Sequence, residues 1–338
     1  MGGGKPKGVD TMQTNRRSFI AGALALSASS ATSVFGQSGY PNRPVRLIVP
    51  YPPGGGTDFF ARLVGSAMSQ SLGQPIIVEN RPGAATVIGA EAVARSTPDG
   101  YTFLLGDVAT YAANPSLYQK LSYDPQKDFS PISLTGRFAI VLLVNTNKLK
   151  VDSVAELVAA AKKAPGSIDY ASGGIGNPFH LASEMFAQAA QIKLNHVPYR
   201  GAAPALQDLA GGQVGMMFVD FATARSQLTT SGIKAIAVAS RTDFAGLPGV
   251  PTVAASGYPG FEAWAWQGFV APAATPSEVI TKLRDCYLTA IQDGEIRKKL
   301  TDAGIDILQS TPTEFGEYMR DETTKWREVI KTASIRVD

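Results

Sequence analysis

Apolar and polar positions follow two patterns that alternate along this chain. Short runs rich in β-branched residues predict buried strands at 45–49, 76–79, 102–105, 140–144, 168–171, 193–197, 214–218 and 233–239. Apolar residues spaced three or four apart predict helices at 58–72, 87–96, 153–163, 178–190, 203–210, 222–230, 276–293, 296–303 and 313–332. Regular alternation of strand and helix indicates an α/β architecture with a mostly parallel sheet.

Two extended segments interrupt this alternation. Residues 131–135 lead into a long apolar run, and residues 261–272 are extended and rich in aromatic side chains. We interpret both as crossings between two lobes, which makes the first lobe discontinuous: residues 38–137 plus 262–338, with 138–261 as the second lobe. A double connection between lobes creates a hinge and a cleft. Trp264 and Trp266 lie in the second crossing, either over a ligand or in hinge and core packing.

The N-terminal residues 1–36 have the pattern of a twin-arginine export signal preceded by a short extension. Asn15-Arg16-Arg17-Ser18-Phe19-Ile20 precedes a brief apolar run, and small residues follow to Gly36. The run is far shorter than the roughly 20 residues of a membrane-spanning helix. We therefore expect an exported protein of the periplasm that does not itself span the membrane. A disordered basic tail is the alternative interpretation.

Charge and composition exclude several classes of protein. The export segment and the whole chain both carry a net charge of +3, so the remainder is close to neutral. A nucleic-acid-binding protein needs a basic face, which this remainder does not supply. The single cysteine, Cys286, excludes an intramolecular disulfide, and one cysteine with two histidines argues against a structural zinc site. We expect neither a cofactor nor a metal, and we interpret Cys286 as a packed thiol.

A glycine-rich loop follows the first predicted strand. The sequence Tyr51-Pro52-Pro53-Gly54-Gly55-Gly56-Thr57-Asp58 ends the strand, and we expect Thr57 to cap the next helix. Strand, glycine-rich loop and helix start, in that order, form an anion pocket from free backbone N–H groups. The loop matches neither a Walker A motif nor a dinucleotide fingerprint, and it lacks lysine and arginine. It suits a small anion rather than a polyphosphate, unless it is only a tight turn.

Three other loops follow predicted strands, at the sheet edge where ligands bind in α/β folds. They contain Asp107 and Val108, the segment 172–180, and Asp220. In segment 172–180, Asn177 is a favoured N-cap and Pro178 a favoured first helical residue. Two helix starts facing one another across a cleft suit a molecule with a carboxylate at each end. His180 either contacts the ligand or braces this loop, and we expect the other histidine, His196, to be structural.

A set of short motifs, taken together and in order, resembles the solute receptors of tripartite tricarboxylate transporters, the Bug receptors. The motifs include Pro52-Pro53-Gly54-Gly55-Gly56-Thr57-Asp58 and Val78-Glu79-Asn80-Arg81-Pro82-Gly83-Ala84, with further matches at 40–50, 98–102, 123–129, 196–201, 211–214 and 247–253. The resemblance implies a two-lobed periplasmic binding protein fold of type II, a Venus flytrap without catalysis. It also implies a monomer that captures an organic carboxylate and delivers it to membrane permease subunits.

The resemblance further implies which residues contact the ligand. Residues matching the binding loops of the family are Tyr51, Pro53, Thr57, Ser172, Gly173, Gly176, Asn177 and His180, and Asp220 matches an acidic position that commonly ends its strand. Asp107 and Val108 stand where many relatives have small hydroxylated residues. Because an ionised Asp107 disfavours a nearby carboxylate, it either selects a ligand with a donor group or caps the following segment. Tyr51, Tyr111 and Phe179 suit an aromatic acid, and aliphatic acids fit equally.

Two other functions deserve comparison with transport. A periplasmic sensor for a signalling partner uses the same closing lobes, so the sequence does not separate the two roles. A hydrolase is the other, since Ser172, His180 and Asp220 are the residue types of a catalytic triad. Ser172 does not stand in a Gly-x-Ser-x-Gly elbow, however, and we expect no enzyme activity.

Overall fold

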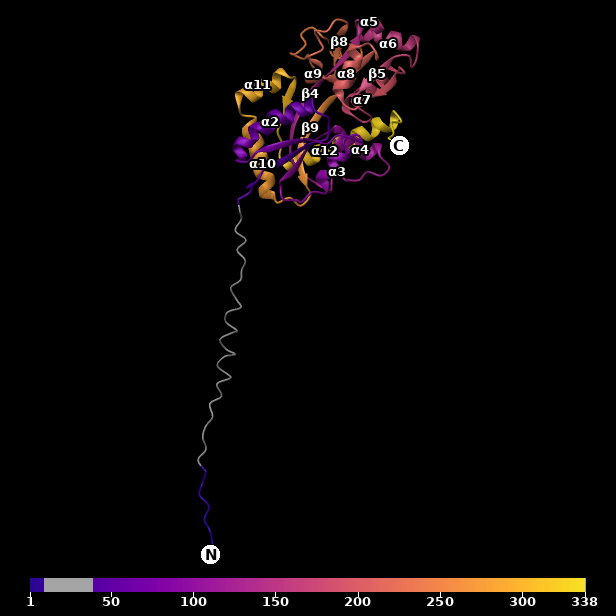
Figure 1. Ribbon diagram of the computed structural model, residues 1–338. Helices are drawn as coiled ribbons and strands as arrows, with labels where there is room; N and C mark the ends of the chain where they lie inside the picture. Colours follow the sequence, from indigo (N-terminus) through magenta and orange to yellow (C-terminus); the bar gives the residue numbers. More distant parts are fainter. Residues whose placement is uncertain (9–38, 338) are drawn as a thin grey trace. The chain divides into compact units, whose positions relative to one another are not determined.

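The computed structural model describes residues 1–8 and 39–337 (Figure 1). The chain separates into two units, Met1–Tyr40 and Pro41–Asp338. In the first unit the described residues form neither helix nor strand, and the predicted export motif lies outside the described residues. All elements below belong to the second unit.

The strands agree closely with the alternating pattern, with additions. They are β1 Val45–Val49, β2 Ile76–Asn80, β3 Thr102–Asp107, β4 Phe129–Asn145, β5 Asp169–Ser172, β6 Asn195–Pro198, β7 Met216–Asp220, β8 Ile233–Val238, β9 Trp264–Pro272 and β10 Ile305–Ile307. The two segments interpreted as crossings are therefore themselves parts of long strands, β4 and β9. The short strand β10 was not predicted.

The helices are α2 Gly56–Leu72, α3 Val87–Ala94, the π-helix η1 Ala109–Ala113, α4 Asn114–Leu117, α5 Thr146–Leu149, α6 Val154–Lys163, α7 Pro178–Ala190, α8 Ala202–Ala210, α9 Phe221–Ala224, α10 Ser277–Ala290, α11 Gly294–Asp302 and α12 Pro312–Thr332. The predicted helix at 222–230 is wrong, because α9 ends after one turn at Ala224. Thr229-Thr230-Ser231-Gly232 follows, and these residues favour turns over helix. The short helices η1, α4 and α5 were not predicted.

The sheet is mixed rather than mostly parallel. Its main order is β2-β1-β3-β9-β4-β7-β5-β6, with β8 and β10 also paired to β4. Strand β1 runs parallel to β2 and β3, and β5 runs parallel to β6 and β7. Every pairing of β4 and β9 is antiparallel. The expectation of a mostly parallel sheet fails because the two predicted crossings pair with each other along their length.

Strand β4 changes partners along its length. Its residues from Phe129 to Ala139 pair with β9, and those from Ile140 to Val144 pair with β7. One strand thus joins the group β1, β2, β3 and β9 to the group β5, β6, β7 and β8. Figure 1 shows α2, α10 and α12 around the first group and α6, α7 and α8 around the second.

The aromatic residues of β9 pack into the structure instead of covering a ligand. Trp266 is almost completely buried, stacks on Tyr111, and donates its indole N–H to Glu322 on α12 at 2.7 Å. Trp264 lies under the Arg137 guanidinium and donates to Glu262 at 2.8 Å. Packing therefore accounts for both tryptophans. Cys286 on α10 is a buried free thiol, as expected.

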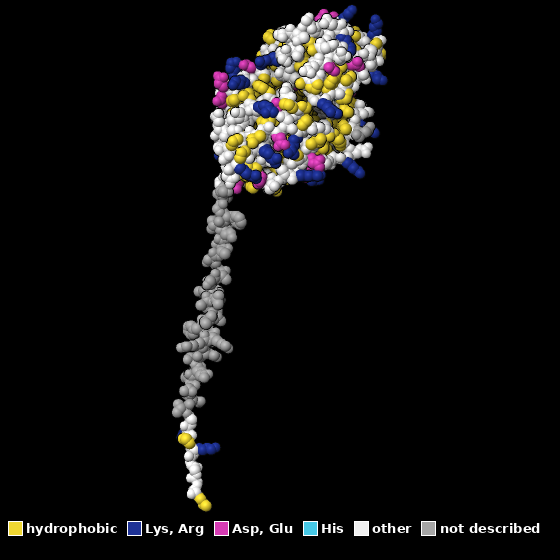
Figure 2. All heavy atoms as spheres, in the orientation of Figure 1, with side chains coloured by type: hydrophobic (Ala, Val, Ile, Leu, Met, Phe, Trp, Pro, Cys, Tyr) yellow, Lys and Arg dark blue, Asp and Glu magenta, His cyan; other side chains and the backbone are white. Residues whose placement is uncertain are grey.

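The surface charge and the hydropathy of the helices were compared with the expectations from the sequence. Figure 2 shows acidic and basic side chains intermixed on the visible face, in keeping with a near-neutral body. Within the described residues, no helix combines the length and apolar character that crossing a bilayer requires.

Candidate functional site

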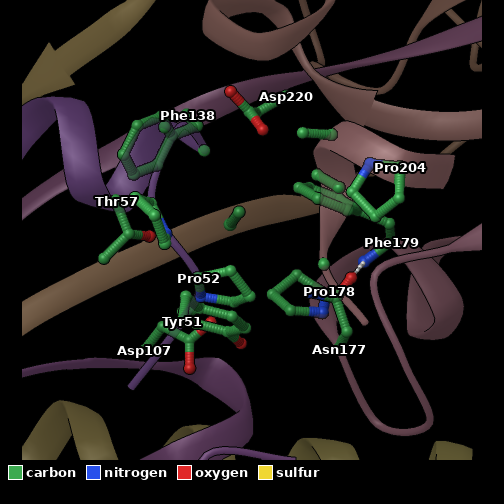
Figure 3. Close-up of a pocket in the computed structure, with 17 residues that line it drawn as sticks. Tyr51, Pro52, Thr57, Asp107, Phe138, Asn177, Pro178, Phe179, Pro204 and Asp220 are labelled. Carbon is green, nitrogen blue, oxygen red and sulfur yellow. Dashed lines mark hydrogen bonds between the residues drawn. The ribbon is translucent and has the colours of Figure 1, made fainter. Parts of the chain in front are cut away.

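A cavity lies where the carboxyl ends of β1, β3, β5, β6 and β7 come together (Figure 3). Of the residues predicted from the sequence, those that line it are Tyr51, Pro53, Thr57, Asp107, Asn177 and Asp220. Phe179, which the sequence analysis considered for an aromatic acid, also lines it. Lining residues that the prediction of binding residues omitted are Pro52, Gly55, Gly56, Phe138, Pro178, Gly201, Ala202, Ala203, Pro204 and Ala265. The structure thus brings the first and third glycine-rich loops to one cavity.

The start of α2 forms one wall of this cavity. The helix begins at Gly56 with Gly55 as N-cap, and no side chain caps it. The prediction of Thr57 as cap is wrong, because Thr57 already lies in the first turn. The first helical residue is Gly56, and a side chain at this position would collide with Asp220 and Phe138. The first-turn N–H groups have no acceptor within the helix, so the positive end of its dipole faces the cavity.

The start of α7 is capped as the sequence predicts. The Oδ1 atom of Asn177 accepts a hydrogen bond from the Phe179 N–H at 2.9 Å, and Pro178 is the first helical residue. Figure 3 shows Asn177, Pro178 and Phe179 along one side of the cavity. Because Asn177 already occupies one of the free donors, this helix presents less unsatisfied backbone than α2 does.

The start of α8 is a third helix terminus at the cavity, and the sequence analysis did not include it. Gly201 is the N-cap with φ of 116°, and no side chain caps the helix. Ala202, Ala203 and Pro204 follow in its first turn and line the cavity. The sequence did contain a signal for this helix start. The predicted strand 193–197 is followed by a glycine and a proline at the start of a helix, as β1 and β5 are.

Asp107 lies at the end of β3, and its carboxylate is engaged by neighbouring groups. Oδ1 accepts from the N–H groups of Ala109 and Thr110 at 3.1 and 3.2 Å and from the Thr110 hydroxyl at 3.1 Å. Oδ2 accepts from the Tyr51 hydroxyl at 2.7 Å. Of the two roles considered for Asp107, these contacts match the capping one. Burial raises the pKa of Asp107, and the hydrogen bond from Tyr51 acts against that rise.

Asp220 caps the short helix α9 from the opposite end of the cavity (Figure 3). Its Oδ1 accepts from the Thr223 N–H and its Oδ2 from the Thr223 hydroxyl, both at 2.8 Å. Burial raises the pKa of this carboxyl, partly offset by the two bonds from Thr223. Both acidic side chains of the cavity thus have donors of their own.

Ser172, Gly173, Gly176 and His180 lie behind the cavity rather than on its lining. His180 accepts the Gly176 N–H at Nδ1 at 3.0 Å, and its ring stacks on His196 with centroids 4.0 Å apart. The Ser172 hydroxyl shares a 2.7 Å hydrogen bond with Nε2 of His196. The two histidines therefore brace the loop that carries Asn177. The bracing interpretation of His180 and the structural one of His196 match this geometry.

Burial lowers the pKa of both histidines, since water no longer stabilises their charged forms. The pKa of His180 falls to about 3, with a further contribution from His196, and that of His196 falls to about 4. Both rings are therefore neutral at physiological pH. Ser172 is completely buried and its hydroxyl pairs with His196, not His180, so the residue types proposed for a hydrolytic triad do not assemble as one.

Val108 does not line the cavity. It is completely buried in an apolar cluster that includes Tyr111, Trp266 and Phe315. Tyr111 belongs to the same cluster and donates its hydroxyl to the Gly268 carbonyl at 3.0 Å, so it does not reach the cavity either. The cluster that holds both residues also includes Met319, Trp326 and Ile330 of α12.

The chemistry of the cavity is that of backbone amides and apolar walls. None of the residues described along its lining is a lysine or arginine. The described part of the chain also contains no group of three histidine, cysteine, aspartate or glutamate side chains placed to hold a metal. What the cavity offers a ligand is two uncapped helix starts, those of α2 and α8, with aromatic and proline surfaces between them.

Sequence comparison finds relatives over nearly the whole chain. The family model described as tripartite tricarboxylate transporter family receptor matches residues 60–335. The protein BugT of Bordetella pertussis is 34% identical over 327 residues, covering 96% of this chain and 100% of BugT.

Structure comparison finds solved structures of the same fold. An R. palustris protein with adipate is 33% identical with a TM-score of 0.84, covering 88% of this chain and 99% of that one. MatC from Rhodopseudomonas palustris, with bound malate, is 31% identical with a TM-score of 0.81, covering 86% of this chain and 100% of MatC. The expected periplasmic binding protein fold is thereby confirmed.

These relatives agree with the family that the motifs indicated, a family of solute-binding receptors and not of enzymes. The chain belongs to the tripartite tricarboxylate transporter family receptors.

Proposed function

We propose that this receptor binds a small organic carboxylate in the cavity between the starts of α2 and α8. The observation that carries the proposal is that both helix starts lack a side-chain cap and face a cavity without lysine or arginine. Free N–H groups at a helix start bind anionic oxygens, and the helix dipole adds to the attraction. A carboxylate carries one negative charge, so backbone N–H groups at a helix start can bind it without a cationic side chain.

The ligand class is a dicarboxylate or an aromatic acid. Structures of two similar proteins contain adipate and malate, which are both dicarboxylates. Tyr51, Phe138 and Phe179 supply apolar surface that suits the hydrocarbon part of either class. Asp107 and Asp220 add little repulsion because donors of the protein already engage their oxygens.

Closure of two lobes encloses the ligand in this proposal. The lobes are residues 38–137 plus 262–338 and residues 138–261, with β4 and β9 as the connections. The change of partner within β4 between Ala139 and Ile140 supports the first boundary. Gly201 of the second lobe lies against Pro52 of the first, which supports a closed arrangement.

The receptor acts in the periplasm as a monomer and delivers its ligand to membrane permease subunits. The twin-arginine motif supports export, and solved relatives described as periplasmic support the location. A strain that lacks this receptor should lose uptake of the acid that the purified protein binds. Unchanged uptake would favour the sensor over the transport role.

Thermal denaturation of the purified protein against a panel of mono- and dicarboxylates tests the binding step. A ligand at about 100 times its dissociation constant adds roughly 2.7 kcal/mol to the free energy of unfolding, so its melting temperature should rise clearly. A panel in which no acid raises the melting temperature would contradict the proposal.

A matched pair of variants at Ala203 tests the role of the α8 start. Ala203→Asp places a negative charge in the first turn, which favours the helix but repels an anionic ligand. We expect affinity for the bound acid to fall more than about tenfold with stability retained. Ala203→Asn, similar in size but neutral, should lose far less. Equal affinities in the two variants would show that the anion lies elsewhere.

A further inference from the structure

A groove lies on the surface where α2 meets α9 and the end of α11 (Figure 1). It consists of two adjoining hollows that share Phe59 and Ala222, and we call it the seam groove. Leu63 and Ala303 add apolar surface, and Phe59 is 41% exposed. Apolar side chains gathered in a groove and bordered by charged ones are typical of a surface that binds another protein.

The seam groove has walls from both of the proposed lobes. Helices α2 and α11 belong to the first lobe, and Ala222 and Thr223 of α9 belong to the second. Arg225, at the end of α9, donates from Nη1 to the Asp302 carbonyl of α11 at 2.9 Å across this seam. Because a rotation of one lobe against the other separates these walls, the groove is complete only in the closed arrangement. A partner that binds it therefore distinguishes the closed receptor from an open one.

The seam groove also adjoins the ligand cavity. Gly55 and Gly56 line both, so only the start of α2 separates the two. The loop before this helix is loosely packed, since a Cβ atom built on Gly54 or Gly55 meets nothing within 4 Å. A partner in the groove thus contacts the same helix start whose N–H groups are proposed to hold the acid. Docking and ligand release are coupled through this short segment.

The charges of the seam groove favour an acidic partner. Its acidic residues, Asp58 and Asp302, each pair with a basic side chain of their own helix. Arg225 and Lys299, in contrast, form no ion pair among the described residues. The same cations oppose a second copy of this chain as the occupant, because a two-fold contact would bring them together.

We infer that the seam groove is the docking site for a periplasmic segment of a permease subunit. This segment places an apolar side chain over Phe59 and a carboxylate near Arg225 and Lys299. The inference rests on the proposed function, because it assigns the surface through which the bound acid is delivered. It explains why an aromatic side chain stays exposed at a seam that closes with the lobes.

Phe59→Ser and Lys299→Glu test the assignment, because neither residue lines the ligand cavity. Each variant is returned to a strain that lacks the receptor, and uptake of the acid found by thermal screening is measured. We expect uptake to fall at least about tenfold, as for the loss of a central interface residue. Affinity of the purified variants for the acid should stay within about twofold of wild type. Immunoblots confirm equal receptor levels in the periplasm.

Ile88→Ser and Lys163→Glu are the matched controls. Ile88 is 52% exposed on α3, and Lys163 lies in the last turn of α6 as Lys299 does in that of α11. Neither lines the seam groove, so uptake should equal that of the wild type.

Three outcomes of the uptake assay overturn the inference while ligand binding by the receptor stands. These are unchanged uptake in both groove variants, an equal loss in the controls, and a loss of affinity that parallels the loss of uptake. A strain without the receptor that keeps full uptake contradicts the proposed transport role, and the inference with it.

Cross-linking identifies the partner directly. A photoreactive benzophenone amino acid replaces Phe59, and membranes of the same strain are irradiated with and without the acid. We expect a product that mass spectrometry identifies as receptor joined to a permease subunit, at least about fivefold more abundant with the acid. The same probe at Ile88 should give no such product. A product with a second receptor, one that forms equally without the acid, or none at all overturns the inference.

Discussion

Gly56, at the start of α2, lies against Asp220, at the end of β7. A Cβ atom built on Gly56 would stand 2.6 Å from Oδ1 of Asp220 and 2.9 Å from the ring of Phe138. Real Cβ atoms do not approach other atoms so closely, so glycine is what allows these two walls of the cavity to meet. The contact joins the two groups of strands that β4 connects.

Gly56→Ala should therefore weaken ligand binding by holding the cavity open. The added methyl cannot fit without moving Asp220, whose carboxylate is fixed by Thr223. We expect a loss of affinity of about five- to 150-fold, since overpacking commonly costs about 1–3 kcal/mol. Isothermal titration with the acid found by thermal screening measures it. Gly65→Ala, on the same helix, is the control, because a Cβ there meets its neighbours only at 3.5 Å or more and Gly65 is not on the cavity lining, so affinity should stay close to wild type.

Asp107 should prove to be a structural cap. Asp107→Leu leaves the Tyr51 hydroxyl and two backbone N–H groups without an acceptor, so we expect the free energy of unfolding to fall by about 2–4 kcal/mol. Asp107→Asn keeps one acceptor oxygen and should lose less than half as much. Urea denaturation measures both. If Asp107→Asn instead changes the preference between acids with and without a donor group, Asp107 contacts the ligand and contributes to its selection.

Stability should fall on acidification because of the two stacked histidines. Their pKa values in the fold, about 3 for His180 and about 4 for His196, lie below the ordinary value of about 6.5. A histidine with a lowered pKa contributes stability above the ordinary value, and that contribution is lost as pH falls towards the folded pKa. The free energy of unfolding should therefore decline steadily as the pH falls from about 6.5 to about 4.

His180→Asn isolates one of these contributions. The asparagine oxygen can take the place of Nδ1 and still accept the Gly176 N–H, but it does not titrate. The decline in stability between pH 6.5 and pH 4 should become shallower in the variant, as followed by denaturation at several pH values. Asp107 and Asp220 have raised pKa values and act with the opposite sign, so the comparison is made between variant and wild type. Identical slopes would contradict the assigned direction.

The loop before α3 contains consecutive non-glycine residues in the left-handed region. Ala84, Ala85 and Thr86 have φ values of 47°, 48° and 78°. This conformation costs an L-residue roughly 1–2 kcal/mol, which glycine avoids. Ala85→Gly should therefore raise the free energy of unfolding by up to about 1 kcal/mol. Ala159→Gly, at an exposed position of α6, should lower it by about the same amount, and a rise in both would refute the explanation.

Local chemistry in the sequence predicted much of the site. The loop after β1, the Asn177 cap and the Pro178 helix start follow from residue types that favour those conformations whatever surrounds them. Ligands of α/β folds bind at the carboxyl ends of the strands, so the loops that follow the strands were expected to meet there. Asp107, Asn177 and Asp220 do line one cavity. The family followed from motifs distributed along the same segments.

Which strands pair with one another was decided only by the tertiary structure. An extended apolar run favours a strand but does not name its neighbour, so the antiparallel pairing of β4 with β9 could not be predicted from either segment. The antiparallel pairing of β9 with β3 likewise places Gln267 opposite Asp107. The pairing of β5 with β6 brings Ser172 and His180 to His196. Residue type determines local backbone conformation, because caps and turns depend on near neighbours. Which side chains line the cavity depends on register and packing between distant segments, since a shift of one residue turns every side chain of a strand to the other face.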